Sequence, residues 1–190
     1  MSRLDDALTN VPRVNFLPDN LKGQADLDIP LSIGYGQTNS QPFNVKTILK
    51  WLDPQPGDNV LDVGSGSGWT TGLISYLVGK NGKVTAVERV PELVSFGKEN
   101  CQKLKLKNVN FYKTNNKLGW AKNSPYDCIL VSASAKKLPI ELLNQLKKPG
   151  KLVIPINESI YVISKDKLGN IKSIENPGFM FVPLIGSFKS

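Results

Sequence analysis

The chain contains no histidine among its 190 residues. Histidine is the usual general base near neutral pH and the commonest metal ligand in proteins. Its absence excludes hydrolytic triads built on imidazole and excludes histidine-based metal chemistry. Any enzyme with this sequence must therefore work without an imidazole group.

Cysteine, arginine and long apolar segments are also scarce. The two cysteines, Cys101 and Cys128, lie in apolar-periodic segments without metal-type spacing, and are predicted to be buried free thiols of a reducing compartment. No apolar run approaches the ~20 residues that span a bilayer, and the acidic N-terminal stretch is unlike a signal peptide. These features predict a cytoplasmic protein without a metal.

The charge is strongly positive, with 24 basic and 16 acidic residues and a formal net charge of +8. Such a charge can indicate a nucleic-acid partner. The lysines between residues 98 and 122, however, have few interleaved aromatic residues. Arginine, which reads bases and phosphates in a bidentate manner, occurs only at Arg3, Arg13 and Arg89. This distribution favours a solvated lysine-rich face, and a nucleic-acid partner is the alternative.

A glycine-rich motif stands out at residues 60–68, which read Val-Leu-Asp-Val-Gly-Ser-Gly-Ser-Gly. An apolar strand that runs into alternating glycines allows the backbone to approach a ligand closely. A second apolar run ends in Glu88, about 20 residues later, which suits a ribose diol. The glycine spacing and Asp62 are typical of methyltransferases that bind S-adenosyl-L-methionine, whereas a plain tight connection is the alternative. The candidate cofactor residues here are Asp62, Gly64, Ser65, Gly66, Gly68, Glu88 and Arg89.

The apolar pattern predicts an α/β fold of the Rossmann-like methyltransferase class. It consists of a mostly parallel, doubly wound sheet with antiparallel C-terminal edge strands. Strands are predicted at residues 59–63, 83–87, 109–113, 126–131, 152–156, 160–164, 171–175 and 179–182. One domain is expected, with an N-terminal cap and substrate-side loop (1–57), a cofactor-binding core (58–156) and C-terminal edge strands (157–190).

The predicted connections also carry specific expectations. Residues 34–39 read as a polar glycine-containing loop, and Ser40 as the N-cap of the next helix, with Pro42 in its first turn. Pro149 and Gly150 are expected to close a helix that holds Ile140, Leu142, Leu143 and Leu146. Because ligands of such sheets bind beyond the C-terminal strand ends, residues 64–68, 88, 114–116 and 132–134 are expected to line one crevice.

Several segments resemble one known family over nearly the whole chain. These segments are residues 11–18 (Val-Pro-Arg to Phe-Leu-Pro), residues 30–42 (Pro-Leu-Ser-Ile-Gly-Tyr-Gly-Gln-Thr-Asn-Ser-Gln-Pro), residues 88–93, 138–139, 145–147 and 150–152, and residues 181–186 (Phe-Val-Pro-Leu-Ile-Gly). In this order they are similar to the protein-L-isoaspartate O-methyltransferases. The stretch at 34–42 and the Phe-Val-Pro-Leu ending are more specific than the glycine motif.

The resemblance implies methyl transfer from S-adenosyl-L-methionine to the α-carboxylate of an isoaspartyl residue, which starts the repair of damaged proteins. It implies that Ser40, the match to the family's active-site serine, orients that carboxylate, while a simple helix N-cap is its alternative role. It places Asn115 and Asn116 near the adenine. The acceptor side is assigned to Thr38, Asn39, Phe43, Val182, Pro183 and Leu184. By residue type alone, residues 182–184 would be an apolar edge strand.

Two departures from the family pattern concern the site. Phe43 stands where the family usually has histidine, which predicts a more apolar substrate mouth. Asn115 stands where the family has an aspartate facing the adenine amino group, so this hydrogen bond lacks charge assistance. Beside the family reaction, two alternatives stay open: a different peptide carboxylate as acceptor, or cofactor binding with little turnover. The net charge of +8 leaves a further alternative, a nucleic-acid substrate. The last is disfavoured because residues 131–134 lack the Asn/Asp-Pro-Pro-aromatic turn of base methyltransferases.

Overall fold

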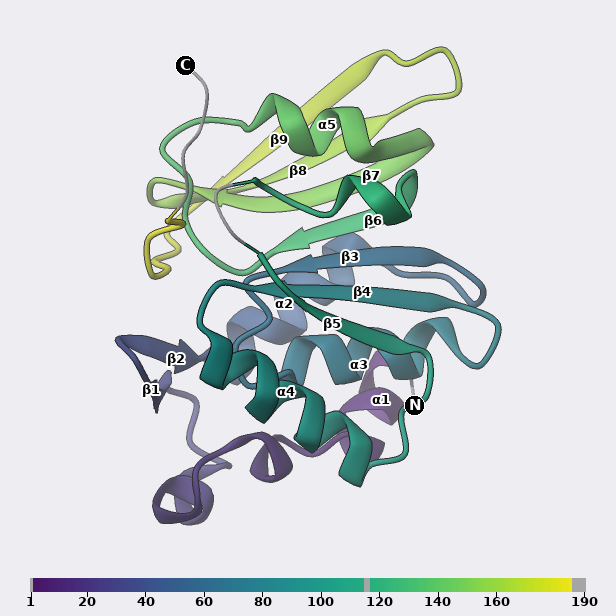
Figure 1. Cartoon of the computed structure of the whole chain (residues 1–190). Coiled ribbons are helices and arrows are strands. Elements are labelled where there is room, and N and C mark those ends of the chain that lie inside the picture. Colours follow the sequence, from purple (N-terminus) through teal and green to yellow (C-terminus); the bar gives the residue numbers. More distant parts are fainter. Residues whose placement is uncertain (1, 115–116, 186–190) are drawn as a thin grey trace.

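The structure is a computed structural model that describes residues 2–114 and 117–185. In the described residues, a seven-stranded sheet has the order β5-β4-β3-β6-β7-β8-β9, and a separate two-stranded sheet pairs β1 with β2 (Figure 1). The strands are β1 (Leu31–Gly34), β2 (Gln37–Asn39), β3 (Asn59–Val63), β4 (Lys83–Glu88), β5 (Val109–Lys113), β6 (Tyr126–Val131), β7 (Leu146–Ile156), β8 (Ser159–Lys165) and β9 (Ile171–Pro177). The α-helices are α1 (Arg3–Asn10), α2 (Pro42–Leu52), α3 (Trp69–Val78), α4 (Pro91–Lys103) and α5 (Ile140–Gln145), and the 3₁₀ turns are η1 (Arg13–Phe16), η2 (Asp19–Gln24) and η3 (Ala121–Asn123).

The large sheet is parallel from β5 to β7 and antiparallel from β7 to β9. This confirms the predicted Rossmann-like class with antiparallel C-terminal strands. The chain passes from β3 to β4 and β5 on one side and then returns to β6 on the other side of β3. The carboxyl end of β3 is therefore the point where the strand order reverses, which is where such sheets bind ligands.

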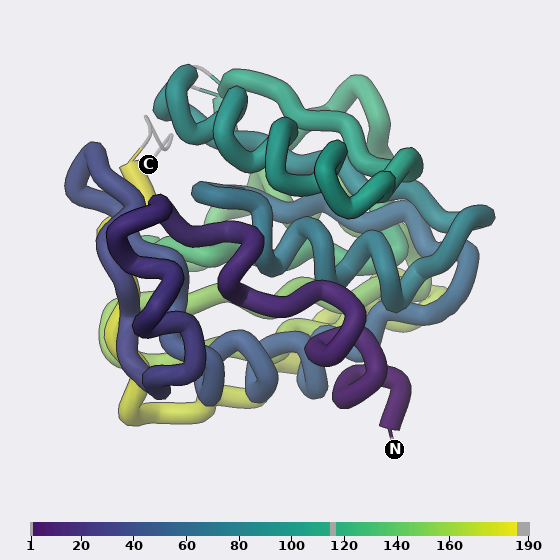
Figure 2. Tube along the Cα trace, turned by 90° about the horizontal axis from the view of Figure 1, so that it is seen from below, coloured from purple at the N-terminus to yellow at the C-terminus, as the bar shows by residue number. Residues whose placement is uncertain are grey.

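The two faces of the sheet are covered differently. Side chains that alternate along each strand divide into two cores, with Val60 in one and Leu61 in the other. The first core packs against α1, α2, α3 and the Cys101 side of α4, and the N-terminal segment lies across the outside of this helical layer (Figure 2). On the second face, α5 is short, and the Tyr112 ring stacks on Trp120 from the following connection at 4.4 Å.

Three sequence predictions are wrong at element boundaries. Residues 34–39 are not a plain loop, because β1 and β2 form a hairpin whose turn residues Tyr35 and Gly36 both have positive φ. β7 starts at Leu146 and runs through Pro149 and Gly150, because an irregularity in its pairing with β6 accommodates them. Residues 179–182 form no strand, and only an isolated bridge joins Pro183 to Ser134.

Both cysteines are free and buried, as predicted, and burial raises the pKa of each thiol to about 12. Within residues 2–114 and 117–185, no helix is both long and apolar enough to span a membrane.

Candidate active site

The glycine-rich turn connects β3 to α3 with three left-handed residues. Gly64, Gly66 and Gly68 have φ of +80°, +50° and +88°, a region that side-chain-bearing residues rarely adopt. The amides of Gly64 and Ser65 both donate to the carbonyl oxygen of Val87 on β4, at 2.9 and 3.2 Å. The turn is thereby fixed to the neighbouring strand end.

Helix α4 packs against the glycine-rich turn, because Gly97 of the helix lies very close to the backbone of Gly66 and Gly68. A Cβ atom added to Gly68 would lie 3.0 Å from the carbonyl oxygen of Gly97, and one added to Gly97 would lie 3.0 Å from the carbonyl oxygen of Gly66. Because these are backbone atoms, neither contact can relax by a side-chain rotation. Gly97 therefore lets α4 lie directly against the turn.

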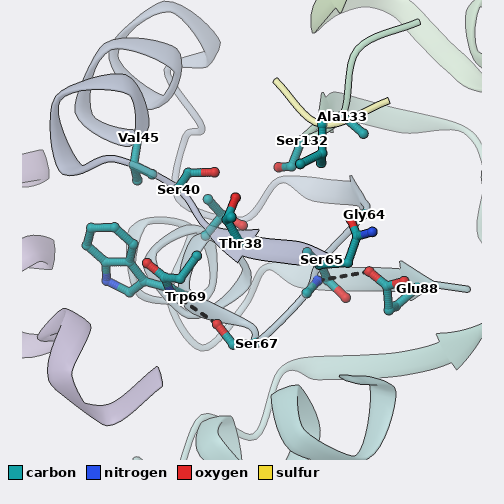
Figure 3. Close-up of a pocket in the computed structure, with 15 residues that line it drawn as sticks. Thr38, Ser40, Val45, Gly64, Ser65, Ser67, Trp69, Glu88, Ser132 and Ala133 are labelled. Atoms are coloured by element: carbon teal, nitrogen blue, oxygen red, sulfur yellow. Dashed lines mark hydrogen bonds between the residues drawn. The ribbon is translucent and has the colours of Figure 1, made fainter. Parts of the chain in front are cut away.

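Glu88 ends β4 beside the turn and is 6% exposed. Its Oε2 accepts a hydrogen bond from the Gly66 amide at 3.1 Å (Figure 3). Its Oε1 accepts from the amides of Arg89 and Val90 at 2.6 and 3.0 Å. Oε2 has room to accept one further bond, whereas Oε1 already accepts two. The carboxylate is thus held rigidly at the edge of the crevice, where a diol could reach it, while the Arg89 side chain is exposed.

Asp62 lies beneath the turn and is fully buried. Its Oδ2 accepts hydrogen bonds from the hydroxyls of Thr70 and Thr71, at 3.1 and 2.6 Å. Burial raises the pKa of this carboxyl to about 6, although the two hydroxyls act in the opposite direction. Asp62 Oδ1 has no hydrogen-bond partner among the described residues. A buried carboxylate atom without a partner is unusual, and Asp62 lies behind the residues that line the crevice rather than among them.

The crevice has two joined hollows that share Gln37, Gly64, Glu88 and Ala133. The first extends toward Ser40, Trp69 and Val182, and the second toward Arg89, Lys117 and Leu184. The hydroxyls of Ser65 and Ser132, both lining the first hollow, are buried without a partner in the described part of the chain. Together with the glycine cradle and the Glu88 carboxylate, these polar groups fit a nucleoside cofactor with a polar tail.

Ser40 lies between β2 and α2, and its side chain faces the first hollow (Figure 3). It is not the N-cap of α2, so that prediction is wrong: the cap residue is Gln41, whose side chain makes no cap bond within the described part of the chain. The exposed carboxylate of Asp28 accepts from the Phe43 amide at 2.8 Å instead. Because Asp28 satisfies the helix terminus, the Ser40 hydroxyl remains available to a ligand.

A third hollow continues from the first and shares Thr38, Ser40, Ser132 and Val182 with it. Its outer wall contains Pro30, Gln41, Asn44, Gly178, Phe179, Met180 and Phe181. We call this third hollow the acceptor groove. It opens beside Ser40, so a chain lying in it could present a side group to the first hollow.

The predicted site residues are brought together to different degrees. Thr38 and Val182 line the acceptor groove, and Leu184 lines the second hollow. Asn39 is 4% exposed, and its side chain is engaged by Arg13 and Ser67. Phe43 is 58% exposed and lines none of the three hollows, and its predicted place at the substrate mouth stays a prediction. Pro183 forms the bridge to Ser134.

Asn115 and Asn116 lie outside the described residues, and their predicted place near the adenine stays a prediction. Sequence reasoning missed Gln37 and Trp69 as lining residues. Their signals were present, because Gln37 is part of the family-like stretch at 30–42 and Trp69 follows the last glycine of the motif. Both side chains are placed in the crevice by the turn that directly precedes each of them in the sequence.

Replacing Glu88 with alanine is expected to weaken binding of S-adenosyl-L-homocysteine by about 1.5–3 kcal/mol, the range for a hydrogen bond to a charged group. The substitution also removes the acceptor of the Gly66 amide, so the turn loses part of its support. Calorimetric titration measures the effect. Glu92→Ala, an exposed glutamate in the first turn of α4, is the matched control and should bind as the native chain does. Equal affinity in Glu88→Ala would remove Glu88 from the site.

Comparison with known proteins agrees with this geometry. Residues 1–189 match the family described as protein-L-isoaspartate (D-aspartate) O-methyltransferase. Relatives named protein-L-isoaspartate O-methyltransferase include one from Methanopyrus kandleri, 40% identical over 97% of this chain and 84% of the relative. Another, from Pyrococcus horikoshii, is 41% identical over 97% of this chain and 85% of the relative.

Solved structures give the same answer. A protein-L-isoaspartate O-methyltransferase superposes with a TM-score of 0.88 and 26% identity over 98% of this chain, which spans 62% of the length of that solved chain. A putative Plasmodium falciparum protein-L-isoaspartate O-methyltransferase in complex with S-adenosyl-L-homocysteine has a TM-score of 0.83 and 28% identity, over 98% of this chain and 92% of that one. The chain therefore belongs to the protein-L-isoaspartate (D-aspartate) O-methyltransferase family.

Proposed function

We propose that this chain carries out the family reaction with Ser40 as the residue that orients the acceptor. It is an S-adenosyl-L-methionine-dependent O-methyltransferase that acts on the α-carboxylate of L-isoaspartyl residues in damaged proteins. One observation carries the assignment of Ser40. Its side chain stands where the first hollow meets the acceptor groove, and Asp28 has taken over the capping role that would otherwise occupy it.

Several residues would hold the cofactor in the two joined hollows. The glycine turn would let the cofactor approach the backbone closely, Glu88 would accept from its ribose hydroxyls, and the Ser65 hydroxyl, which has no partner among the described residues, would offer a further polar contact. When bound, S-adenosyl-L-methionine supplies an electrophilic methyl group on a positively charged sulfur. The buried Asp62 carboxylate adds a negative charge beneath the glycine-rich turn.

The acceptor chemistry explains how a chain without histidine can catalyse this transfer. A carboxylate is already ionised at neutral pH, so no general base has to remove a proton before the attack. With the donor bound, the carboxylate oxygen would take the methyl carbon, and the sulfur would keep the electron pair of the broken carbon–sulfur bond. Ser40 donates a hydrogen bond that aims the carboxylate, and Trp69, Val45 and Val182 exclude water from the hollow. Positioning of this kind can contribute several kcal/mol to the rate.

The acceptor groove suits an extended peptide. The Val182 carbonyl accepts from the Ser134 amide and the Leu184 amide donates to the Ser134 carbonyl, both at 2.8 Å. Because successive residues of extended backbone face opposite sides, Phe181 and Pro183 direct their backbone groups away from Ser134. Pro183 can accept but cannot donate, so it would pair with an amide of the peptide.

The reaction is tested with a radiolabelled methyl donor, an isoaspartyl peptide and its normal aspartyl twin. The native chain should label the isoaspartyl peptide and leave the twin unlabelled. Ser40→Ala should lower turnover by about 10–100-fold, within the range for a positioned hydrogen-bonding group, while its affinity for S-adenosyl-L-homocysteine stays within about 2-fold.

The matched control is Ser95→Ala, which removes an exposed hydroxyl on α4 and should leave turnover unchanged. Phe43→His, which restores the family residue, should preserve activity because Phe43 lies outside the hollows. If neither the native chain nor Phe43→His labels any isoaspartyl peptide although the cofactor binds, the reaction is ruled out. Such a result would favour a different acceptor or a cofactor-binding role.

The natural partners follow from this assignment. We propose that they are proteins that present an isoaspartyl residue in a flexible segment, since the acceptor groove accepts extended chain. Two buried free thiols are typical of a reducing compartment, which supports the cytoplasm as the place where these partners are met.

A further inference from the structure

Arg13 is the most heavily hydrogen-bonded side chain of the N-terminal segment. It lies in η1, far in sequence from the crevice, and is only 5% exposed. Its guanidinium donates to two separate stretches of chain. The acceptors on one side are the carbonyls of Ala25, Leu27 and Ile29, at 3.3, 2.9 and 2.8 Å, and on the other side Asn39 Oδ1, the Asn39 carbonyl and the Ser40 carbonyl, at 2.8, 3.1 and 3.1 Å.

These contacts require the shape of a guanidinium. Arginine carries five N–H donors in a planar fork, and here they reach six acceptors, five of which are backbone carbonyls. The Trp69 ring at the start of α3 covers the guanidinium, with the Arg13 Cζ atom 5.5 Å from the ring centroid. A lysine ammonium has three donors on a single atom and cannot span both stretches.

Asp28 lies in the stretch at residues 25–29 that Arg13 holds, and it stabilises the start of α2. It sits between Leu27 and Ile29, whose carbonyls both accept from Arg13. Its carboxylate in turn accepts from the Phe43 amide at 2.8 Å and from the Gln41 side chain at 3.1 Å. Ser40 therefore lies between two contacts, with its own carbonyl held by Arg13 and the helix after it capped by Asp28.

Asn39 extends the same network to the glycine-rich turn. Its Oδ1 accepts from Arg13 and its Nδ2 donates to the Ser67 hydroxyl at 3.1 Å. The Ser67 carbonyl in turn accepts from the Asn100 side chain of α4 at 3.1 Å. One continuous chain of buried polar contacts thus joins the backbone of Ser40 to the cofactor turn.

We propose that Arg13 is a positioning residue for the acceptor: it sets the place of Ser40 relative to the glycine-rich turn, with Asp28 and Asn39 as its two extensions. Arg13 touches neither substrate nor cofactor in this assignment and acts only through Ser40. The proposal rests on the proposed role of Ser40 and names the residue that fixes the position of that serine.

The test is a double-mutant cycle between Arg13 and Ser40. Arg13→Met keeps an apolar stem of similar length but removes every donor, and it should lower kcat/KM for an isoaspartyl peptide by about 10-fold or more. In the Ser40→Ala background the same change should cost less than about 2-fold, because the serine that it positions is already gone. Binding of S-adenosyl-L-homocysteine, followed by calorimetry, should weaken by less than about 5-fold.

Arg3 provides the matched control. It also donates to backbone, from α1 to the Pro54 carbonyl at 2.6 Å, but it lies away from the crevice. Arg3→Met should lower the urea midpoint of unfolding without changing kcat/KM, and it should do so equally with and without Ser40. Arg13→Lys keeps the positive charge and should remain as slow as Arg13→Met.

Three results would overturn the proposal: a kcat/KM within 2-fold of native in Arg13→Met, a loss that adds in full to that of Ser40→Ala, or full recovery in Arg13→Lys. If Arg13→Met does not fold, Arg13→Lys and Asp28→Ala, at an exposed position, carry the same cycle. Failure of the proposed function is distinct, because the native chain itself would then label no isoaspartyl peptide, and failure of the Ser40 role would show as a Ser40→Ala chain that is as active as the native one.

Discussion

The Asp62→Asn variant is expected to be more stable than the native chain at pH 8 in the absence of cofactor, by about 3 kcal/mol in unfolding free energy. The pKa of the buried Asp62 carboxyl is raised from 3.8 to about 6 by burial. At about 1.4 kcal/mol per pKa unit, ionising this group in the folded state costs roughly that amount. Asparagine has nearly the same shape and no charge, and it can still accept from Thr71.

The sign of the pH dependence follows from linkage. Because the folded pKa exceeds the unfolded value, the contribution of Asp62 to the unfolding free energy falls as the pH rises from about 4 to about 6 and is level above that. The advantage of Asp62→Asn should therefore vanish near pH 4. Urea unfolding at pH 4, 6 and 8 measures it, with exposed Asp26→Asn as the control. Equal stability of the two chains at pH 8 would contradict the prediction. The variant should also bind the cationic cofactor less tightly.

Gly97→Val should unfold more easily than the native chain by about 3 kcal/mol and should lose nearly all cofactor binding. A Cβ at this position meets Phe111 Cε1 at 2.8 Å and the Gly66 carbonyl oxygen at 3.0 Å, and two γ-carbons add to the overlap. The φ of Gly97 is an ordinary helical one, so helix propensity alone would favour a side chain here. The expected loss therefore comes from the turn, which α4 would push out of place.

Urea unfolding and calorimetry with S-adenosyl-L-homocysteine measure both effects. Gly23→Val is the matched control, because a Cβ at Gly23 meets no atom of the residues that the structure describes within 4 Å. Gly97→Ala should show the same two effects at smaller size. A Gly97→Val chain that binds the cofactor normally would show that α4 does not support the turn.

Much of the sheet could be predicted because its signals are local. The strands at 59–63, 109–113 and 126–131 match the predicted bounds, since each is a compact apolar run followed by a turn. The hairpin of β1 and β2 could not be predicted in this way, because alternation over Leu31–Gly34 is too short to distinguish from a loop. The end of α5 was misplaced because β7 contains Pro149 and Gly150, which usually end an element and here lie at an irregularity of the pairing.

The residues of the site also fall into those that local sequence predicts and those that depend on contacts between distant segments. The glycine turn and Glu88 are readable from the sequence because they follow their strands directly. Asp28 as the support of α2, and Gly97 as the support of the turn, depend on contacts between distant segments. Neither residue type suggests such a role. An aspartate in an irregular stretch is usually a solvated turn residue, and a glycine inside a helix can serve close packing against any neighbouring element.

The acceptor groove is built from segments outside the seven-stranded sheet. Its walls come from the hairpin, the start of α2 and residues 178–182. The last of these segments is held by the Gly178 and Phe179 amides, which donate to the Glu158 carbonyl, and by the Val182 carbonyl, which accepts from the Ser134 amide. Substitutions of wall residues that are not buried, such as Asn44 and the 81% exposed Met180, should reduce folding stability little. Natural variants or engineered libraries with substitutions in the groove could thus accept different peptide side chains next to the damaged residue. The residues that bind the methyl donor would stay unchanged. Directed evolution of acceptor range should begin at these positions.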